Sequence, residues 1–161
     1  MGRRFQPAIF PGTAPFVLSG KYKTAETFVD GAPLVIDANG ELTECGADPA
    51  IIDGVALEGV ATKPGWDAAN SPTVVTGRVQ EVSFAKADRL TVWSGRAING
   101  GTDPVTPAQT NIDEEYGIVK TGTDWVIDIA EVAATRIRIV DIDIDQKIFF
   151  FKFLEANIPS N

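Results

Sequence analysis

The sequence has 161 residues, with 22 acidic and 14 basic side chains and a formal net charge of −8, a size that corresponds to a single domain. The acidic balance argues against nucleic acid as a partner, because phosphate contacts require a basic surface. No apolar stretch reaches the roughly 18 residues that a transmembrane helix needs, so we expect no membrane partner either. The sequence has no histidine, which excludes catalytic triads with an imidazole base and histidine-ligated zinc.

The first 20 residues are predicted to form an extended N-terminal arm, the first of three units. Residues 1–25 hold four basic side chains and no acid, a charge of +4 that leaves −12 on the other 136 residues. A basic, proline-rich leader is typical of a disordered tail, but its three phenylalanines also fit an arm that docks on another chain. We expect the docking residues of this arm to be Arg3, Arg4, Phe5, Phe10 and Phe16.

Residues 21–145 are predicted to form a β domain, the second unit, because short β-branched runs alternate with turn residues. Asn39-Gly40 is the clearest hairpin turn, since this pair tolerates positive φ, and Thr121-Gly122-Thr123 predicts a second hairpin. Helical periodicity is scarce, whereas many short strands at regular spacing favour an all-β fold, a small sandwich or barrel. The other expected elements are a strand at 73–85 with either a bulge near Gly77 or two buried faces, a strand at 89–93, a surface loop at 99–111 and a long strand at 135–145.

Three aspartates mark the long strand at 135–145. Alternation places Asp141, Asp143 and Asp145 on one face of this strand. A calcium loop of the EF-hand type starting at Asp141 requires glycine at position 146 and a carboxylate at 152, where this chain has Gln146 and Lys152. Two carboxylates are also all that glycoside hydrolysis needs, but any acidic protein offers such pairs. We therefore expect the aspartates to face solvent or basic partners without binding a metal.

The apolar parity of the same strand changes along its length. Ile137 and Ile139 share a face with the aspartates, whereas Arg136 and Arg138 share the other face with Val140. A continuous strand facing one core does not accommodate this pattern. We expect either a bulge near Val140 or a segment that leaves one core for another environment. The second alternative fits an oligomer, in which Arg136 and Arg138 pair with aspartates of a neighbouring subunit.

Residues 146–161 are the third predicted unit, a C-terminal strand that is apolar on both faces. In a small monomer such a strand must lie centrally in a sheet, because an exposed apolar edge promotes aggregation. The alternative is burial against another subunit, which predicts a homo-oligomer. In that case the interface residues of this strand are Phe149, Phe150, Phe151 and Phe153.

No catalytic motif is present in the sequence. It contains neither the Gly-x-Ser-x-Gly nucleophile elbow nor the dinucleotide-binding Gly-x-Gly-x-x-Gly. Cys45 is the only cysteine and is expected to be a buried, inert thiol in a protein made in a reducing compartment. The first residues lack the apolar region of a secretory signal. We expect no enzymatic activity, no catalytic residues and no cofactor.

Several motifs together carry a resemblance to a known family. The run 27–60 contains the pieces Phe-x-x-Gly-x-Pro-Leu-Val, Asp-x-x-Gly-x-Leu and Ile-x-Gly-Val-Ala. With Ala87-Asp88-Arg89-Leu90 and Tyr116-Gly117-Ile118-Val119 further on, residues 24–130 resemble the small head decoration proteins, or capsid cement proteins, of tailed bacteriophages. The resemblance implies a β-rich protein, often a trimer, with the major capsid protein and further copies of itself as partners. It also implies a place on the outside of the virion capsid, after synthesis in the host cytoplasm.

Two other functions stay open at this point. Trp66, Trp93 and Trp125 would be stacking platforms in a carbohydrate- or receptor-binding β module of a virion appendage, although core packing is the expected use of Trp93 and Trp125. A hydrolase built on an acid pair is the other alternative. The resemblance leads us to expect a structural virion protein that binds and stabilises the outer surface of a phage capsid.

Overall fold

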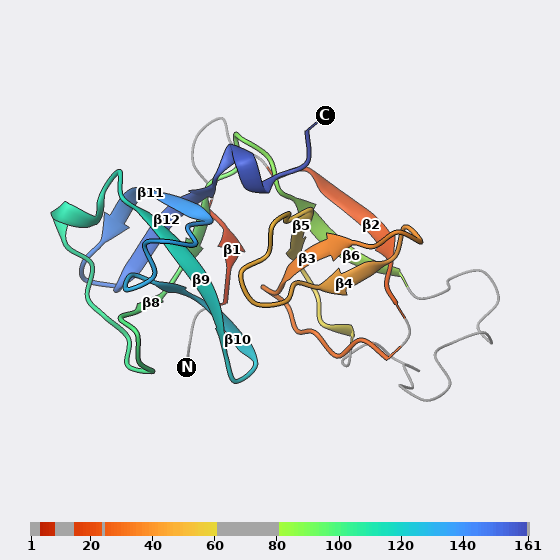
Figure 1. Cartoon of the computed structure of the whole chain (residues 1–161), viewed down its shortest axis with the longest axis horizontal. Coiled ribbons are helices and arrows are strands. Elements are labelled where there is room, and N and C mark those ends of the chain that lie inside the picture. Colours follow the sequence, from red (N-terminus) through yellow and green to blue (C-terminus); the bar gives the residue numbers. More distant parts are fainter. Residues whose placement is uncertain (1–3, 9–14, 24, 61–80, 161) are drawn as a thin grey trace.

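The computed structural model describes residues 4–8, 15–23, 25–60 and 81–160. Within these ranges the chain is all-β, which confirms the predicted class, and its strands form two sheets that lie side by side in Figure 1. One hydrophobic cluster contains residues of both sheets, an arrangement consistent with a β-sandwich. Within the described ranges, no helix has the length and apolar character that a membrane span requires.

The larger sheet has seven strands in the order β1-β7-β12-β11-β9-β10-β8. Their bounds are β1 Gln6–Pro7, β7 Trp93–Gly95, β8 Ala97–Ile98, β9 Glu115–Thr121, β10 Asp124–Asp128, β11 Ile137–Asp143 and β12 Ile148–Phe153. Neighbouring strands are antiparallel except β8 and β10, which run parallel. Two short 3-10 turns, η2 Gln109–Asn111 and η3 Glu155–Asn157, precede β9 and follow β12.

The smaller sheet has five antiparallel strands in the order β2-β6-β5-β3-β4. Their bounds are β2 Val17–Lys21, β3 Pro33–Ile36, β4 Leu42–Glu44, β5 Gly54–Ala56 and β6 Glu81–Lys86. β6 is the described part of the strand expected at 73–85, and the bulge expected near Gly77 lies outside the described residues. Of the expected arm 1–20, the described residues contribute β1 to the larger sheet and the first residues of β2 to the smaller one.

Both predicted hairpin turns are confirmed. β3 and β4 are joined through Asn39-Gly40, where Gly40 has φ +77° and the Asp37 carboxylate accepts hydrogen bonds from the N–H groups of Asn39 and Glu41. These backbone donors hold the pKa of Asp37 below its usual value, with the bond from Glu41 the largest cause. β9 and β10 are joined through Gly122, which has φ +64°. Both turns place glycine where L-residues are strained.

The predicted change of parity in β11 is a β-bulge. Ile139 pairs with Phe151 of β12, and the next pair is Asp141 with Phe150, so Val140 is the extra residue. Before the bulge Ile137 and Ile139 are fully buried, and beyond it Ile142 packs against the core instead. The bulge thus shifts the inward positions from odd to even residue numbers, as expected for one inserted residue.

The C-terminal strand lies in the interior of the larger sheet. β12 pairs with β11 on one side and with β7 on the other. Phe149, Phe151 and Phe153 are at most 4% exposed and belong to the shared core cluster. The first of the two alternatives for this strand, a central position in the monomer, is therefore the one observed. Residues 148–153 are part of the β domain rather than a separate tail.

The strand expected at 89–93 begins later than predicted. The Asp88 carboxylate accepts hydrogen bonds from the N–H groups of Leu90 and Thr91, at 2.8 and 2.6 Å. These bonds make a local turn, which competes with extended pairing. β7 consequently starts at Trp93.

Candidate functional site

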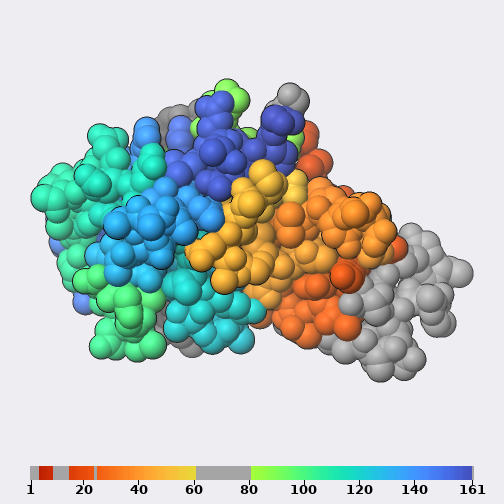
Figure 2. Space-filling model, viewed as in Figure 1, coloured from red at the N-terminus to blue at the C-terminus, as the bar shows by residue number. Residues whose placement is uncertain are grey.

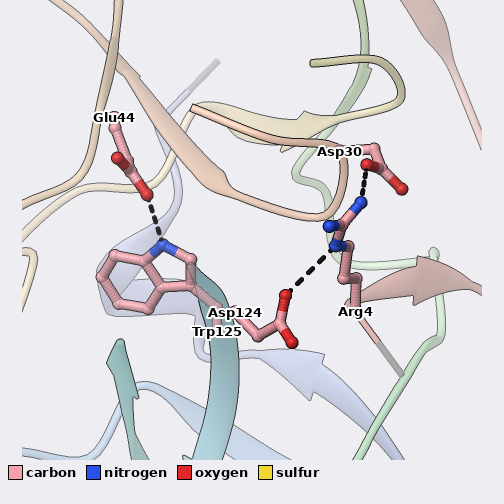
Figure 3. Close-up of polar contacts among 5 residues, drawn as sticks. All are labelled: Arg4, Asp30, Glu44, Asp124 and Trp125. Carbon is pink, nitrogen blue, oxygen red and sulfur yellow. Dashed lines mark hydrogen bonds and ion pairs between the residues drawn. The ribbon is translucent and has the colours of Figure 1, made fainter. Parts of the chain in front are cut away.

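Arg4 joins the two sheets. Its Nε donates a hydrogen bond of 3.1 Å to Oδ1 of Asp124, the first residue of β10, and its Nη1 contacts the carboxylate of Asp30, which precedes β3 (Figure 3). The hydrogen bond to Asp124 raises the pKa of Arg4, with a further contribution from the charge of Asp30. We expected Arg4 to lie near acidic groups of another chain. It does lie near two carboxylates, but Asp30 and Asp124 belong to its own chain.

Glu44, at the end of β4, makes a second contact between the sheets. Its Oε1 accepts a hydrogen bond of 2.8 Å from the indole Nε1 of Trp125, and its Oε2 lies 2.7 Å from Nζ of Lys120 (Figure 3 draws the indole contact). The Glu44 side chain is only 14% exposed. Both carboxylate oxygens of Glu44 thus contact side chains of the hairpin that β9 and β10 form.

Arg136 makes a third contact, with the loop between β4 and β5. Its Nε donates to the carbonyl oxygen of Pro49 at 2.6 Å and its Nη2 to that of Asp48 at 3.0 Å. Nearby, the side-chain amide of Asn157 donates to the carbonyl of Ala50 at 3.0 Å. In Figure 2 this yellow-orange loop lies against the blue and cyan part of the larger sheet. The Arg136 guanidinium therefore donates its hydrogen bonds to backbone carbonyls of its own chain.

Arg138 also finds an intrachain partner. Its Nε donates to Oε1 of Glu115, the first residue of β9, at 3.2 Å. Neither Arg136 nor Arg138 reaches the aspartates of β11. The carboxylates of Asp141 and Asp143 instead accept bonds from the N–H groups of Ile142 and Gln146, both at 2.8 Å.

The aspartates line an open groove along β11. Asp141, Asp143 and Asp145 border it together with Gln109, Ile142, Ile144 and Phe150. Asp141 and Asp145 are exposed and Asp143 is half-buried. Within the described residues, no group of three or more acidic or thiol side chains has the geometry of a metal site.

Four of the phenylalanines expected at an interface lie inside the chain. Phe5, Phe149, Phe151 and Phe153 are 0–4% exposed, so their burial leaves no surface for a second subunit in this conformation. The Phe5 ring packs edge-on against Phe151, with ring centroids 5.0 Å apart. The physical reason is that the edge strand β1 and the central strand β12 face one core. Of the other expected residues, Phe150 is half-buried, Phe16 is exposed, and Arg3 and Phe10 lie outside the described residues.

An exposed apolar strip lies at the start of β2, where Phe16 precedes the strand and Val17 and Leu18 are its first two residues. Phe16, Val17 and Leu18 are 62%, 53% and 36% exposed. β2 is an edge strand, with β6 as its neighbour in the described part of the sheet. Because the Lys86 N–H donates to the Phe16 carbonyl at 2.8 Å, the alternating antiparallel pattern turns the N–H and C=O groups of Val17 and Ser19 away from β6.

Sequence reasoning identified Phe16 but missed Val17 and Leu18. The signal was present in the run Phe16-Val17-Leu18, three consecutive apolar residues within the presumed arm. A three-residue run is compatible with a strand, but the periodicity of so short a segment does not distinguish a strand from an arm.

Two of the three tryptophans and the cysteine are buried. Trp93 and Trp125 are 0% and 2% exposed, as expected for core residues, and Trp66 lies outside the described residues. Cys45 is 5% exposed, and burial raises the pKa of its thiol to about 12, with smaller contributions from the carboxylates of Asp53 and Glu44. The expectation of a buried, inert thiol is thus supported by its position.

The fold and contacts define a two-sheet β protein whose sheets are joined by Arg4, Glu44 and Arg136 and whose smaller sheet ends in an apolar edge strand. No protein-family model, curated protein or solved structure matches the chain.

Proposed function

We propose that this protein binds the outer surface of a tailed-phage capsid and stabilises the shell as a structural component of the virion. The observation that carries the proposal is the strip Phe16-Val17-Leu18 at the start of the edge strand β2, where exposed apolar side chains alternate between the two faces of the strand. The resemblance of residues 24–130 to head decoration proteins supports the choice of the capsid as partner.

Binding at this strip uses both backbone and side chains. The N–H and C=O groups of Val17 and Ser19 point away from β6 and are placed to pair with an extended segment of the major capsid protein. Main-chain bonds of this kind supply affinity, and the exposed side chains of Phe16 and Leu18 supply apolar contact. No catalytic group is required for this role.

Modest affinity is sufficient for such a protein. A ligand that binds only the assembled shell stabilises it by about 2.7 kcal/mol per site when its free concentration is a hundred times Kd. Because a capsid repeats the same site many times, the total becomes large without any single strong contact.

We also propose that the protein forms a homo-oligomer, with a trimer as the expected state. Phe149, Phe151 and Phe153 give this proposal no support, because they are buried within the chain, whereas Phe150 is half-buried. Its support comes from the β2 strip and from the resemblance. Light scattering at micromolar concentration, with and without shells, measures the state directly, and a monomer under both conditions contradicts it.

The experiment that tests the proposed function compares two matched substitutions in a shell-binding assay. Val17→Lys places a charge on the β2 strip, whereas Val132→Lys places the same charge on a valine that is 68% exposed elsewhere. Shells lacking decoration protein are mixed with each variant and sedimented. We expect Val17→Lys to weaken binding at least tenfold and Val132→Lys to bind like the unmodified protein. Equal binding of the two variants excludes the strip as the site, and no binding of the unmodified protein excludes the function.

A further inference from the structure

We propose that Asn39 is a self-modification site, at which the folded chain deamidates without an enzyme, whereas the fold protects the other described Asn-Gly pair, Asn99-Gly100, from the same reaction. The co-reactant is water and the leaving group is ammonia. In an Asn-Gly pair the glycine nitrogen attacks the side-chain amide of the asparagine, because glycine has no side chain to obstruct the approach. The inference concerns this chain alone and is independent of the proposed function.

The reaction has two steps, and both balance with water alone. The Gly40 nitrogen loses its proton and bonds to Cγ of Asn39, the bond from Cγ to Nδ2 breaks, and Nδ2 leaves as ammonia with that proton. Water then opens the cyclic imide at one of its two carbonyl carbons. Opening at Cγ gives aspartate, and opening at the main-chain carbon gives isoaspartate, in which the backbone runs through the side chain.

Both Asn-Gly pairs are open to water in the structure. Asn39, Gly40, Asn99 and Gly100 are all exposed. The two glycines also have similar backbone torsions, with φ +77° at Gly40 and +64° at Gly100. Access of water and glycine geometry therefore do not distinguish the two pairs. The difference lies in what holds each glycine nitrogen.

The two glycine N–H groups have acceptors of different charge. The Gly40 N–H donates to the main-chain carbonyl of Asp37 at 3.0 Å, and the Asp37 carboxylate accepts from the Asn39 N–H instead. The Gly100 N–H donates to the Asp128 carboxylate itself, at 2.9 Å. A hydrogen bond to an ionised acceptor is stronger, and a negative charge beside an N–H group disfavours the loss of its proton. The Gly100 nitrogen is therefore the weaker nucleophile.

The surroundings of the two pairs differ as well. Asn39-Gly40 lies in the turn between β3 and β4, and a Cβ atom at Gly40 would have no heavy atom beyond its chain neighbours within 4 Å. A Cβ atom at Gly100 would lie 3.4 Å from Cβ of Ala130, and the Asp128 carboxylate also accepts from the Ala130 N–H at 3.0 Å. The Asn39 turn thus has room to rearrange, whereas Asn99-Gly100 is held against the end of β10.

Deamidation at this turn changes both charge and backbone. One added carboxylate takes the formal net charge from −8 to −9 and lies two positions from Asp37. Isoaspartate adds one carbon to the main chain between β3 and β4, so the turn that joins the Asp37 carbonyl to the Gly40 N–H must rearrange. The same hairpin carries Glu44, which contacts the larger sheet. Aged protein should therefore be a mixture of forms that differ at one turn.

The test follows both sites in the unmodified full-length protein during incubation at mildly alkaline pH. Tandem mass spectrometry of the tryptic peptides that contain Asn39 and Asn99 locates the mass gain produced when a carboxylate replaces an amide. The same protein unfolded in urea gives the rate of each site without structure. The ratio of unfolded to folded rate is the protection of the site. We expect deamidation at Asn39 in the folded protein, partly as isoaspartate, and at least tenfold greater protection at Asn99.

Asp128→Asn is the matched variant, because it replaces the charged acceptor of the Gly100 N–H by a neutral amide oxygen. It should raise the rate at Asn99 at least threefold and leave the rate at Asn39 unchanged. Equal protection of the two sites, or greater protection at Asn39, overturns the proposal, and this comparison needs no variant. An unchanged Asn99 rate in folded Asp128→Asn protein also overturns it, because the carboxylate is the stated cause of the protection. If the variant does not fold, the two sites of the unmodified protein decide alone.

Discussion

The indole Nε1 of Trp125 donates a hydrogen bond of 2.8 Å to Oε1 of Glu44, and this bond links the β10 strand of the larger sheet to the β4 strand of the smaller one. Trp125 is 2% exposed, so its N–H has no access to bulk water. The stability of the sheet contact therefore depends on an acceptor at position 44.

A substitution of Glu44 should lower the stability most when it leaves no hydrogen-bond acceptor for Trp125. Glu44→Ala leaves the buried Trp125 N–H without its partner and is expected to lower the free energy of unfolding by about 1–3 kcal/mol. Glu44→Gln keeps an amide oxygen in place and should lose less. Urea denaturation of both variants measures the difference, and equal losses would contradict the importance of the indole bond.

Two phenylalanines from the presumed arm should behave oppositely. Phe5 is 1% exposed, so Phe5→Ala is expected to lower the free energy of unfolding by about 3–5 kcal/mol. Phe16 is 62% exposed, and Phe16→Ala should change it by about 0.5 kcal/mol or less. Chemical denaturation gives both values. Near-equal small effects would show that the segment containing Phe5 is not docked in solution.

Two glycines provide a matched test of packing in the smaller sheet. A Cβ atom at Gly54 would lie 2.6 Å from the carbonyl oxygen of Ala85, so Gly54→Ala should destabilise the fold by about 1–3 kcal/mol through overpacking. Gly46 has open space around its Cβ position, and Gly46→Ala should be neutral to within about 0.5 kcal/mol. A thermal melt of each variant is sufficient. A stable Gly54→Ala variant would be inconsistent with the close approach of β5 and β6.

Cys45 should make stability fall at alkaline pH. The pKa of its thiol is raised from 9.0 to about 12 by burial, so between these values the unfolded chain ionises and the folded chain does not. Its contribution to stability is complete below pH 9 and is lost as the pH rises toward 12. The free energy of unfolding measured from pH 8 to 11 should fall less steeply in Cys45→Ala. Identical pH profiles would count against the buried thiol.

The sequence predicted the local features of the fold and left the non-local ones open. The Asn39-Gly40 turn was readable because it depends on adjacent residues, and the bulge at Val140 was readable because it interrupts an alternating pattern. The central place of β12 could only be stated as one of two alternatives, since strand order depends on residues far apart in the chain.

The sequence also did not indicate which chain would contact the residues expected at a subunit interface. Arg4 and Arg136 do lie at an interface, but it is the one between the two sheets of their own chain. Composition and charge indicate that an arginine needs acceptors, and they do not indicate which chain supplies them. The exposed edge of β2 was missed because the residues of its neighbour, β6, are 60 to 68 positions away in sequence.

The most direct test of the central claim measures shell stability. Shells with and without the protein are heated, and the temperature at which they release DNA is recorded at full occupancy. Decorated shells should release DNA at a higher temperature than bare shells, and this increase should be retained with Val132→Lys and lost with Val17→Lys at the same protein concentration. Equal release temperatures for bare and fully occupied shells would contradict a stabilising role on the capsid.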